Sequence, residues 1–301
     1  MAENLVRLFF ERPKRFWLHV LVHNTKLLRS DFIYLKLKWA LSDMPYKLNL
    51  DNPKSFNEKL QWMKIHNRKA IYTTMVDKDA AKDYVASRIG VNHIIKTLAS
   101  WKSPNDIDWS TLPNKFVLKT THDSGGLVIC RDKDKLDKEK AYTKIKKSLE
   151  RDYYWMSREW PYKNVPKRII AEEYMEQADG SPLIDYKFFC FNGKPEFLYV
   201  SQGLENHETA RMSFLTMEWT FAPFHRSDYR PFDTLPQKPV LFDEMVQIAS
   251  KLSAGHPFLR VDLYEIKGQI YFSELTFTPC SGMLPFEPLK WDYILGDYIT
   301  L

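Results

Sequence analysis

The feature that most constrains this chain is a pair of alternating apolar segments near its C-terminal end, FLRVDLYEI and QIYFSELTF, which are separated by a Lys-Gly dipeptide. Two such segments around a short glycine-containing turn predict a β-hairpin. With a turn centred on Gly268, Asp262 lies opposite Glu274. Arg260 and Thr276 then pair on the same face. The other face is apolar and fixes the register by burial, since it carries Leu259, Val261, Leu263, Leu275 and Phe277.

The two opposed carboxylates of this hairpin repel each other unless a cation lies between them. Mg²⁺ meets that need, because it binds one or two protein carboxylates and completes its shell with water and phosphate oxygens. Arg260 would add a fixed positive charge for a phosphate or a carboxylate. An exposed hairpin with a cross-strand ion pair fits the same spacing. The hairpin residues alone leave both interpretations open.

A second informative segment is KFVLKTTHDSGG, in which an apolar strand ends in Lys119 and runs into Ser124, Gly125 and Gly126. The chain has only 10 glycines in 301 residues, so an adjacent pair directly after a strand is informative. Small residues let backbone N–H groups approach phosphate oxygens, and a lysine at the strand end supplies a point charge. A plain hairpin turn is the alternative, because no Walker loop motif is present.

Two further segments carry charge on strands. RIIAEEYMEQ places Glu172, Glu173 and Glu176 at the end of a strand. In IDYKFFCF, alternation puts Asp185 and Lys187 on one face of the next strand. Taken from the residues alone, that polar pair indicates a solvated face.

Composition and charge limit the classes of protein to consider. The chain is 44% hydrophobic and 27% charged, which excludes a disordered or collagenous protein. The net charge is +6, and the first forty residues supply +5 of it, from eight basic and three acidic side chains. A nucleic-acid-binding protein should carry its positive charge as a patch on the folded body, so we expect no nucleic-acid partner. Three scattered cysteines without CxxC spacing favour neither disulfides nor zinc, and we expect a cytoplasmic protein.

The basic N-terminal segment alternates cationic and bulky apolar side chains from residue 5 to residue 40, with a break at Pro13. This pattern predicts two amphipathic helices. They could lie on anionic lipid at the inner membrane face, or pack against the core of the protein. The apolar stretch Phe16–Val22 is too short for a secretory signal or a membrane-spanning helix.

The remaining pattern is a helical N-terminal part followed by mixed strands and helices, which predicts the α+β class. We expect a helix that starts at Ser55 or Asn57 and others at 79–89, 137–150, 239–253 and 288–299. We expect strands at 115–120, 127–131, 168–175, 184–191, 195–201, 211–219, 258–266 and 269–277.

In their order along the chain, these segments resemble the ATP-grasp superfamily. The segments NPKSFNEKLQW, VDKDAAKDYV, LPNKFVLKTTHDSGG, AEEYME, DYKFFCFNGKP, RVDLY and ELTFTPCSG resemble its TupA-like branch, named after a teichuronopeptide biosynthesis protein. The resemblance runs from about residue 45 to the C-terminal end. It implies an ATP-grasp fold in which two α+β lobes sandwich ATP. It also implies a division into an arm (1–50), a substrate region (51–115), a nucleotide-lid subdomain (116–180) and a C-terminal catalytic subdomain (181–301).

The resemblance assigns nucleotide contacts to several residues. Lys119 matches the strand lysine at the ATP phosphates, and Lys78 an additional nucleotide-facing lysine. The other matches are the phosphate loop (Ser124, Gly125, Gly126), the hinge beside adenine (Glu172, Glu173, Tyr174) and the acid near the ribose (Glu176).

The resemblance also assigns the reacting end of the site. Asp262 and Glu274 match the carboxylates that hold Mg²⁺. Thr276 stands where the third metal ligand is usually Asn. Arg260 matches the arginine that stabilises the transferring phosphoryl group, and Lys187 resembles a phosphate-binding lysine.

The implied activity is that of an ATP-dependent carboxylate–amine ligase, which forms an amide through an acyl phosphate. Association of the branch with surface polysaccharides implies that an amino acid or amine is joined to a carboxyl sugar, either glycan-linked or carried on a nucleotide. A glycosyltransferase of capsule or O-antigen biosynthesis is the alternative. Asp132 and Asp134 form a DxD pattern, which binds a metal and a nucleotide sugar in many glycosyltransferases. That pattern lies in a highly charged run, which favours a solvated turn.

Overall fold

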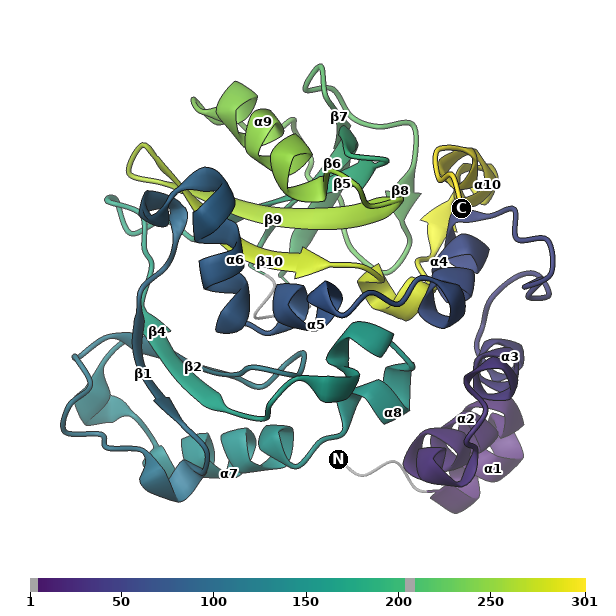
Figure 1. Cartoon of the computed structure of the whole chain (residues 1–301), viewed down its shortest axis with the longest axis horizontal. Coiled ribbons are helices and arrows are strands. Elements are labelled where there is room, and N and C mark those ends of the chain that lie inside the picture. Colours follow the sequence, from purple (N-terminus) through teal and green to yellow (C-terminus); the bar gives the residue numbers. More distant parts are fainter. Residues whose placement is uncertain (1–4, 204–208) are drawn as a thin grey trace.

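The computed structural model describes residues 5–203 and 209–301. Two antiparallel sheets, one of four and one of five strands, form the body of the molecule. Figure 1 shows the smaller sheet at the lower left and the larger sheet above it, with α5 and α6 between them. The N-terminal helices form an arm on the other side of the view.

The four-stranded sheet has the order β1-β4-β2-β3. Its strands are β1 (Thr97–Trp101), β2 (Phe116–Thr120), β3 (Leu127–Cys130) and β4 (Ile169–Glu173). Phe116 and Leu118 of β2 are buried in a core that includes Ile145 of helix α7 (Lys138–Leu149). Because side chains alternate along a strand, Val117 and Lys119 lie on the opposite face of β2.

The five-stranded sheet has the order β10-β9-β5-β6-β7 and is covered on both faces. Its strands are β5 (Ile184–Phe191), β6 (Lys194–Gln202), β7 (Arg211–Thr216), β9 (Phe258–Ile266) and β10 (Gln269–Thr276). One face packs on α5 (Ile71–Val76), α6 (Ala80–Ile89) and α9 (Phe242–Ser253). The other packs on α4 (Phe56–His66) and on the C-terminal residues around α10 (Lys290–Asp297). This double burial explains the apolar run Phe188–Phe191 in the second half of β5.

The hairpin formed by β9 and β10 contains both expected pairs, Asp262 opposite Glu274 and Arg260 opposite Thr276. The expected turn centre was wrong, because a two-residue turn joins Ile266 directly to its partner Gln269. Both turn residues have positive φ, 53° and 74°, as a tight type I′ turn requires. The register shifts by one residue between Phe272 and Glu274. That bulge restores the pairing that the shorter turn would have lost.

Helix α4 and several short elements complete the body. Helix α4 begins with a capping box in which Ser55 and Glu58 each bond the backbone of the other, so Ser55 is the N-cap. The remaining elements are α8 (Tyr153–Ser157), the ladder of β8 (His225–Arg226) with β11 (Phe286–Glu287), and the 3₁₀ turns η1 (Thr25–Leu27), η2 (Val91–His93), η3 (Pro104–Asp106), η4 (Lys133–Lys135), η5 (Trp160–Asn164) and η6 (Pro279–Gly282).

The arm contains three helices, α1 (Leu5–Glu11), α2 (Pro13–His23) and α3 (Asp31–Leu41), where the sequence predicted two. Pro13 starts α2, as its missing N–H allows. The chain breaks again before Ser30, whose side chain accepts a hydrogen bond from the backbone N–H of Ile33 and caps α3. None of the helices in the described ranges is long and apolar enough to span a membrane.

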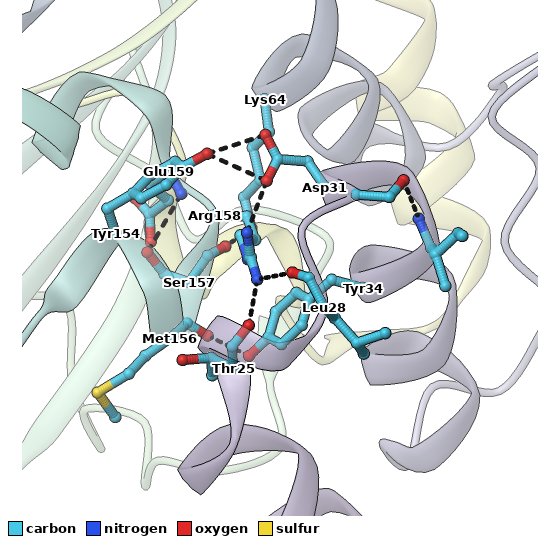
Figure 2. A network of polar contacts seen from close by, with 12 residues as sticks. Thr25, Leu28, Asp31, Tyr34, Lys64, Tyr154, Met156, Ser157, Arg158 and Glu159 are labelled. Atoms are coloured by element: carbon cyan, nitrogen blue, oxygen red, sulfur yellow. Dashed lines mark hydrogen bonds and ion pairs between the residues drawn. The ribbon is translucent and has the colours of Figure 1, made fainter.

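A fully buried arginine, Arg158, fixes the arm to the body (Figure 2). Its guanidinium lies 2.9 Å from the Asp31 carboxylate and donates to the backbone oxygens of Thr25 and Leu28, each at 2.7 Å. It also lies 4.4 Å from the ring centroid of Tyr34. The packed-arm alternative therefore holds for η1 and α3.

We expect Asp31→Asn to lower the free energy of unfolding by about 3 kcal/mol or more, because it leaves the Arg158 charge buried and unpaired. Asp43→Asn is the matched control, since Asp43 is 76% exposed and pairs with Arg15 at 3.4 Å. It should cost less than about 1 kcal/mol. Urea unfolding of both variants measures the difference, and equal losses would contradict the role given to Arg158.

Candidate functional site

A cavity of about 600 Å³ lies between the two sheets. Eleven of the residues singled out from the sequence line it, namely Lys78, Lys119, Ser124, Gly125, Gly126, Glu172, Glu173, Tyr174, Glu176, Lys187 and Glu274. Arg260, Asp262 and Thr276 are absent from its lining and lie behind it on the hairpin. The glycine loop, the Glu-rich strand end and one hairpin carboxylate therefore share one cavity.

Lys119 is held at the cavity wall by Glu172 of the neighbouring strand. The Glu172 carboxylate is buried, 2.5 Å from the Lys119 amine and 2.7 Å from the Lys82 amine. Burial alone would raise the pKa of Glu172, but Lys119 and Lys82 outweigh it and keep that pKa below its usual value. Lys82 also donates to the backbone oxygen of Ile95 and to Thr97. Glu172 is thus an ionised bridge that positions Lys119.

Sequence reasoning missed Lys82. Its segment VDKDAAKDYV carries no periodic signal for this role, because Lys78 lies in the turn before α6 and only Lys82 is on the helix. Only the fold shows that Lys82 of α6 meets the end of β4.

The glycine loop is tethered at both ends and open in the middle. Asp123 is buried and accepts a hydrogen bond from Ser148 at 2.6 Å, and its backbone oxygen accepts one from the Lys78 amine. A Cβ on Gly126 would lie 1.9 Å from the Ser148 hydroxyl oxygen, so only glycine fits there. Gly125 has a φ of 91° and is exposed. The loop can therefore present backbone N–H groups to an anion in the cavity.

The hinge after β4 forms the far end of the cavity. Apolar side chains of Ile95, Val117 and Ile129 line it, as a planar aromatic ring requires. Tyr174 accepts a hydrogen bond from Arg131 at 3.0 Å, and Glu176 pairs with Lys115 at 2.7 Å. The side chains of Tyr174 and Glu176 are thus held by cations at the edge of the cavity.

The hairpin carries a row of alternating charges. Asp262 is 1% exposed, and its two oxygens accept hydrogen bonds of 2.7 Å from Nε and Nη2 of Arg260 and one of 2.7 Å from Lys187. Arg260 continues toward Glu274, at 3.5 Å, and Thr276 donates to Glu274 at 2.7 Å. In this structure Arg260 lies between the two carboxylates that sequence reasoning expected to repel each other.

These neighbours keep Glu274 and Lys187 charged. Burial works against ionisation, but Arg260 and Lys78 lower the pKa of Glu274 to about 2. Burial likewise opposes the charge of Lys187, but Asp185 and Asp262 raise its pKa well above the usual value. The hairpin side of the cavity therefore carries fixed charges at neutral pH.

Asp185 is a second residue that sequence reasoning misplaced. The face of β5 that carries it was interpreted as solvated, yet Asp185 lines the cavity, 3.2 Å from the Lys187 amine. The error arose because other elements pack on both faces of the sheet, and the face of β5 that carries Asp185 and Lys187 borders the cavity and not bulk solvent.

The donor set suits a divalent ion that is shared with phosphate. The described residues contain no group of three or more His, Cys, Asp or Glu side chains that could hold a metal unaided. Mg²⁺ needs only one or two protein carboxylates when phosphates and water complete its shell. Glu274 lines the cavity in its ionised form, whereas Asp262, opposite it across the hairpin, is buried and already accepts hydrogen bonds from Arg260 and Lys187. Glu274 therefore fits Mg²⁺ that is bound together with a triphosphate, and Asp262 supports it from behind the cavity wall.

Comparisons with known proteins show the family of this chain. A family model described as TupA-like ATPgrasp matches residues 58–300, so the chain belongs to the TupA-like ATP-grasp family and has its α+β fold. No curated protein matches the chain in sequence.

Among solved structures, D-alanine–D-alanine ligase from Bacillus anthracis, complexed with ATP, is similar over 68% of this chain and 55% of that chain, with 14% identity and a TM-score of 0.41. The chain thus spans little more than half the length of that ligase. D-alanine–D-alanine ligase from Helicobacter pylori is similar over 83% of this chain and 70% of that chain, with 14% identity and a TM-score of 0.44.

We expect Lys119→Met to weaken ATP binding about 10- to 100-fold, because a charged hydrogen bond to phosphate is lost. Lys135→Met is the control, since Lys135 is 85% exposed and pairs with Asp132 outside the cavity. Calorimetric titration with ATP measures both affinities. An unchanged affinity in the Lys119 variant would contradict the placement of the ATP phosphates at this end of the cavity.

Proposed function

We propose that this member of the TupA-like ATP-grasp family is an ATP-dependent carboxylate–amine ligase that forms an amide through an acyl phosphate. The observation that carries the proposal is the charge row from Lys187 through Asp262 and Arg260 to Glu274, which ends in the cavity that also contains Lys119. Such a row provides fixed charges at the point where phosphoryl transfer develops negative charge.

ATP would occupy the cavity with its base at the hinge and its phosphates between the glycine loop and the hairpin. Lys119 and Lys78 would contact the phosphates, and the backbone of Ser124 to Gly126 would cover them. Glu173, Tyr174 and Glu176 would contact the base and ribose side. When bound, Mg²⁺ would neutralise phosphate oxygens and would be held by Glu274. The resemblance also assigns Asp262 and Thr276 to the metal, with Thr276 in the usual position of Asn, and both lie behind the cavity lining.

The reaction itself would proceed in two steps. A substrate carboxylate oxygen attacks the γ-phosphorus, the bond to the ADP oxygen breaks, and an acyl phosphate forms. An amine then attacks the acyl carbon, the bond to the phosphate oxygen breaks, and the amine loses a proton as inorganic phosphate leaves. Arg260 and Lys187 would stabilise the transferring phosphoryl group, and the protein supplies no covalent nucleophile.

For the substrates, we propose an amino acid or simple amine and the carboxyl group of a sugar used in surface polysaccharide synthesis, and for the location the cytoplasm. The resemblance to the teichuronopeptide branch supports the sugar acid. The three free cysteines support a reducing compartment.

The glycosyltransferase alternative loses its sequence support. Asp132 caps the 3₁₀ turn η4 and pairs with the exposed Lys135. Neither Asp132 nor Asp134 is among the residues that line the cavity. The DxD pattern is therefore a surface turn.

We expect ADP release that requires ATP, Mg²⁺, a carboxylate and an amine together, and that falls 100-fold or more in Asp262→Asn because Arg260 and Lys187 lose their shared counter-ion. Asp132→Asn is the discriminating control, with full activity for a ligase and none for a DxD glycosyltransferase. A coupled assay for ADP, run over a panel of amino acids and uronic acids, measures both. Release of a nucleoside diphosphate from a sugar donor would contradict the proposal.

A further inference from the structure

The outer surface of helices α1 and α2 is unusually apolar for a protein surface. Phe10 is 77% exposed, Trp17 51% and Leu27, in the adjoining turn η1, 81%. The rings of Phe9 and Phe16 connect Phe10 to Trp17 through edge-to-face contacts, with centroids 5.0 to 5.4 Å apart. Large exposed apolar patches of this kind mark interaction surfaces.

This surface is also cationic. Arg12, Lys14 and Arg29 are exposed and make no ion pair within residues 5–203 and 209–301. Within residues 5–50, each acidic side chain is paired with a cation. The charge left on the surface is positive.

The arm is already attached to the body through η1 and α3, so the exposed rings of α1 and α2 are not needed for that attachment. Tyr34, Leu35 and Trp39 of α3 are buried, and Arg158 holds η1 and α3 in place (Figure 2). The exposed side of α1 and α2 is therefore available to a partner.

We propose that helices α1 and α2 form a docking surface for an anionic lipid bilayer. Phe10, Trp17 and Leu27 would enter the boundary between headgroups and acyl chains, and Arg12, Lys14 and Arg29 would lie among the phosphates. The combination of unpaired cations with exposed aromatic rings favours lipid over a neutral protein partner. This inference is independent of the proposed ligase chemistry, because it rests on residues outside the cavity.

The test is flotation of the full chain with vesicles of phosphatidylcholine, with and without phosphatidylglycerol. We expect binding to the anionic vesicles only, weakened by salt. Phe10→Glu with Trp17→Glu should lower the affinity at least tenfold. Arg12→Gln with Lys14→Gln should lower it by roughly fivefold for each residue at low salt.

The matched control is Val91→Glu with Val240→Glu, which adds the same charge at positions 73% and 87% exposed elsewhere on the body. It should bind vesicles like the unaltered chain, and equal ATP affinity in every variant shows that each is folded. Absence of binding by the unaltered chain, or equal loss in the control, would overturn the proposal. Light scattering provides a second test. A homodimer of the unaltered chain that dissociates in Phe10→Glu with Trp17→Glu would also overturn the proposal, because the surface would then join two copies of the chain.

Discussion

The burial of Asp262 is the constraint on which the rest of the site depends. A carboxylate that is 1% exposed is tolerated only if cations satisfy it, and here Arg260 and Lys187 do so from the same strand and from the neighbouring one. Because both cations are committed to Asp262, they are also fixed beside Glu274 and the cavity. The charge that would be costly in an ordinary core thereby organises the reacting end of the site.

The same logic operates at the opposite wall. Glu172 is buried and ionised only because Lys119 and Lys82 flank it, and this pairing aims Lys119 into the cavity. Each sheet thus contributes a buried carboxylate that positions lysines at the cavity. Residues from both sheets line one cavity, as the proposed binding of a triphosphate between the two sheets requires.

Sequence reasoning succeeded where alternation and burial act together. The hairpin pairs, the strand 184–191 and the strand 258–266 follow from an apolar face that allows a single register. It failed where the answer depends on tertiary contacts. Hydrophobic periodicity does not indicate such features in the sequence. Examples are the bulge before Glu274, the roles of Lys82 and Asp185, and the third helix of the arm. Strand β1 was also missed, because none of its five residues is fully buried and Ser100 is exposed.

The central claim is that the glycine loop and the hairpin hold one triphosphate between them. A crystal structure of the full chain with Mg²⁺ and a non-hydrolysable ATP analogue tests it most directly. We expect the γ-phosphate between the Lys119 amine and the Glu274 carboxylate, with the base against Val117 at the hinge. A nucleotide bound outside this cavity, or one whose phosphates point away from Glu274, would contradict the account.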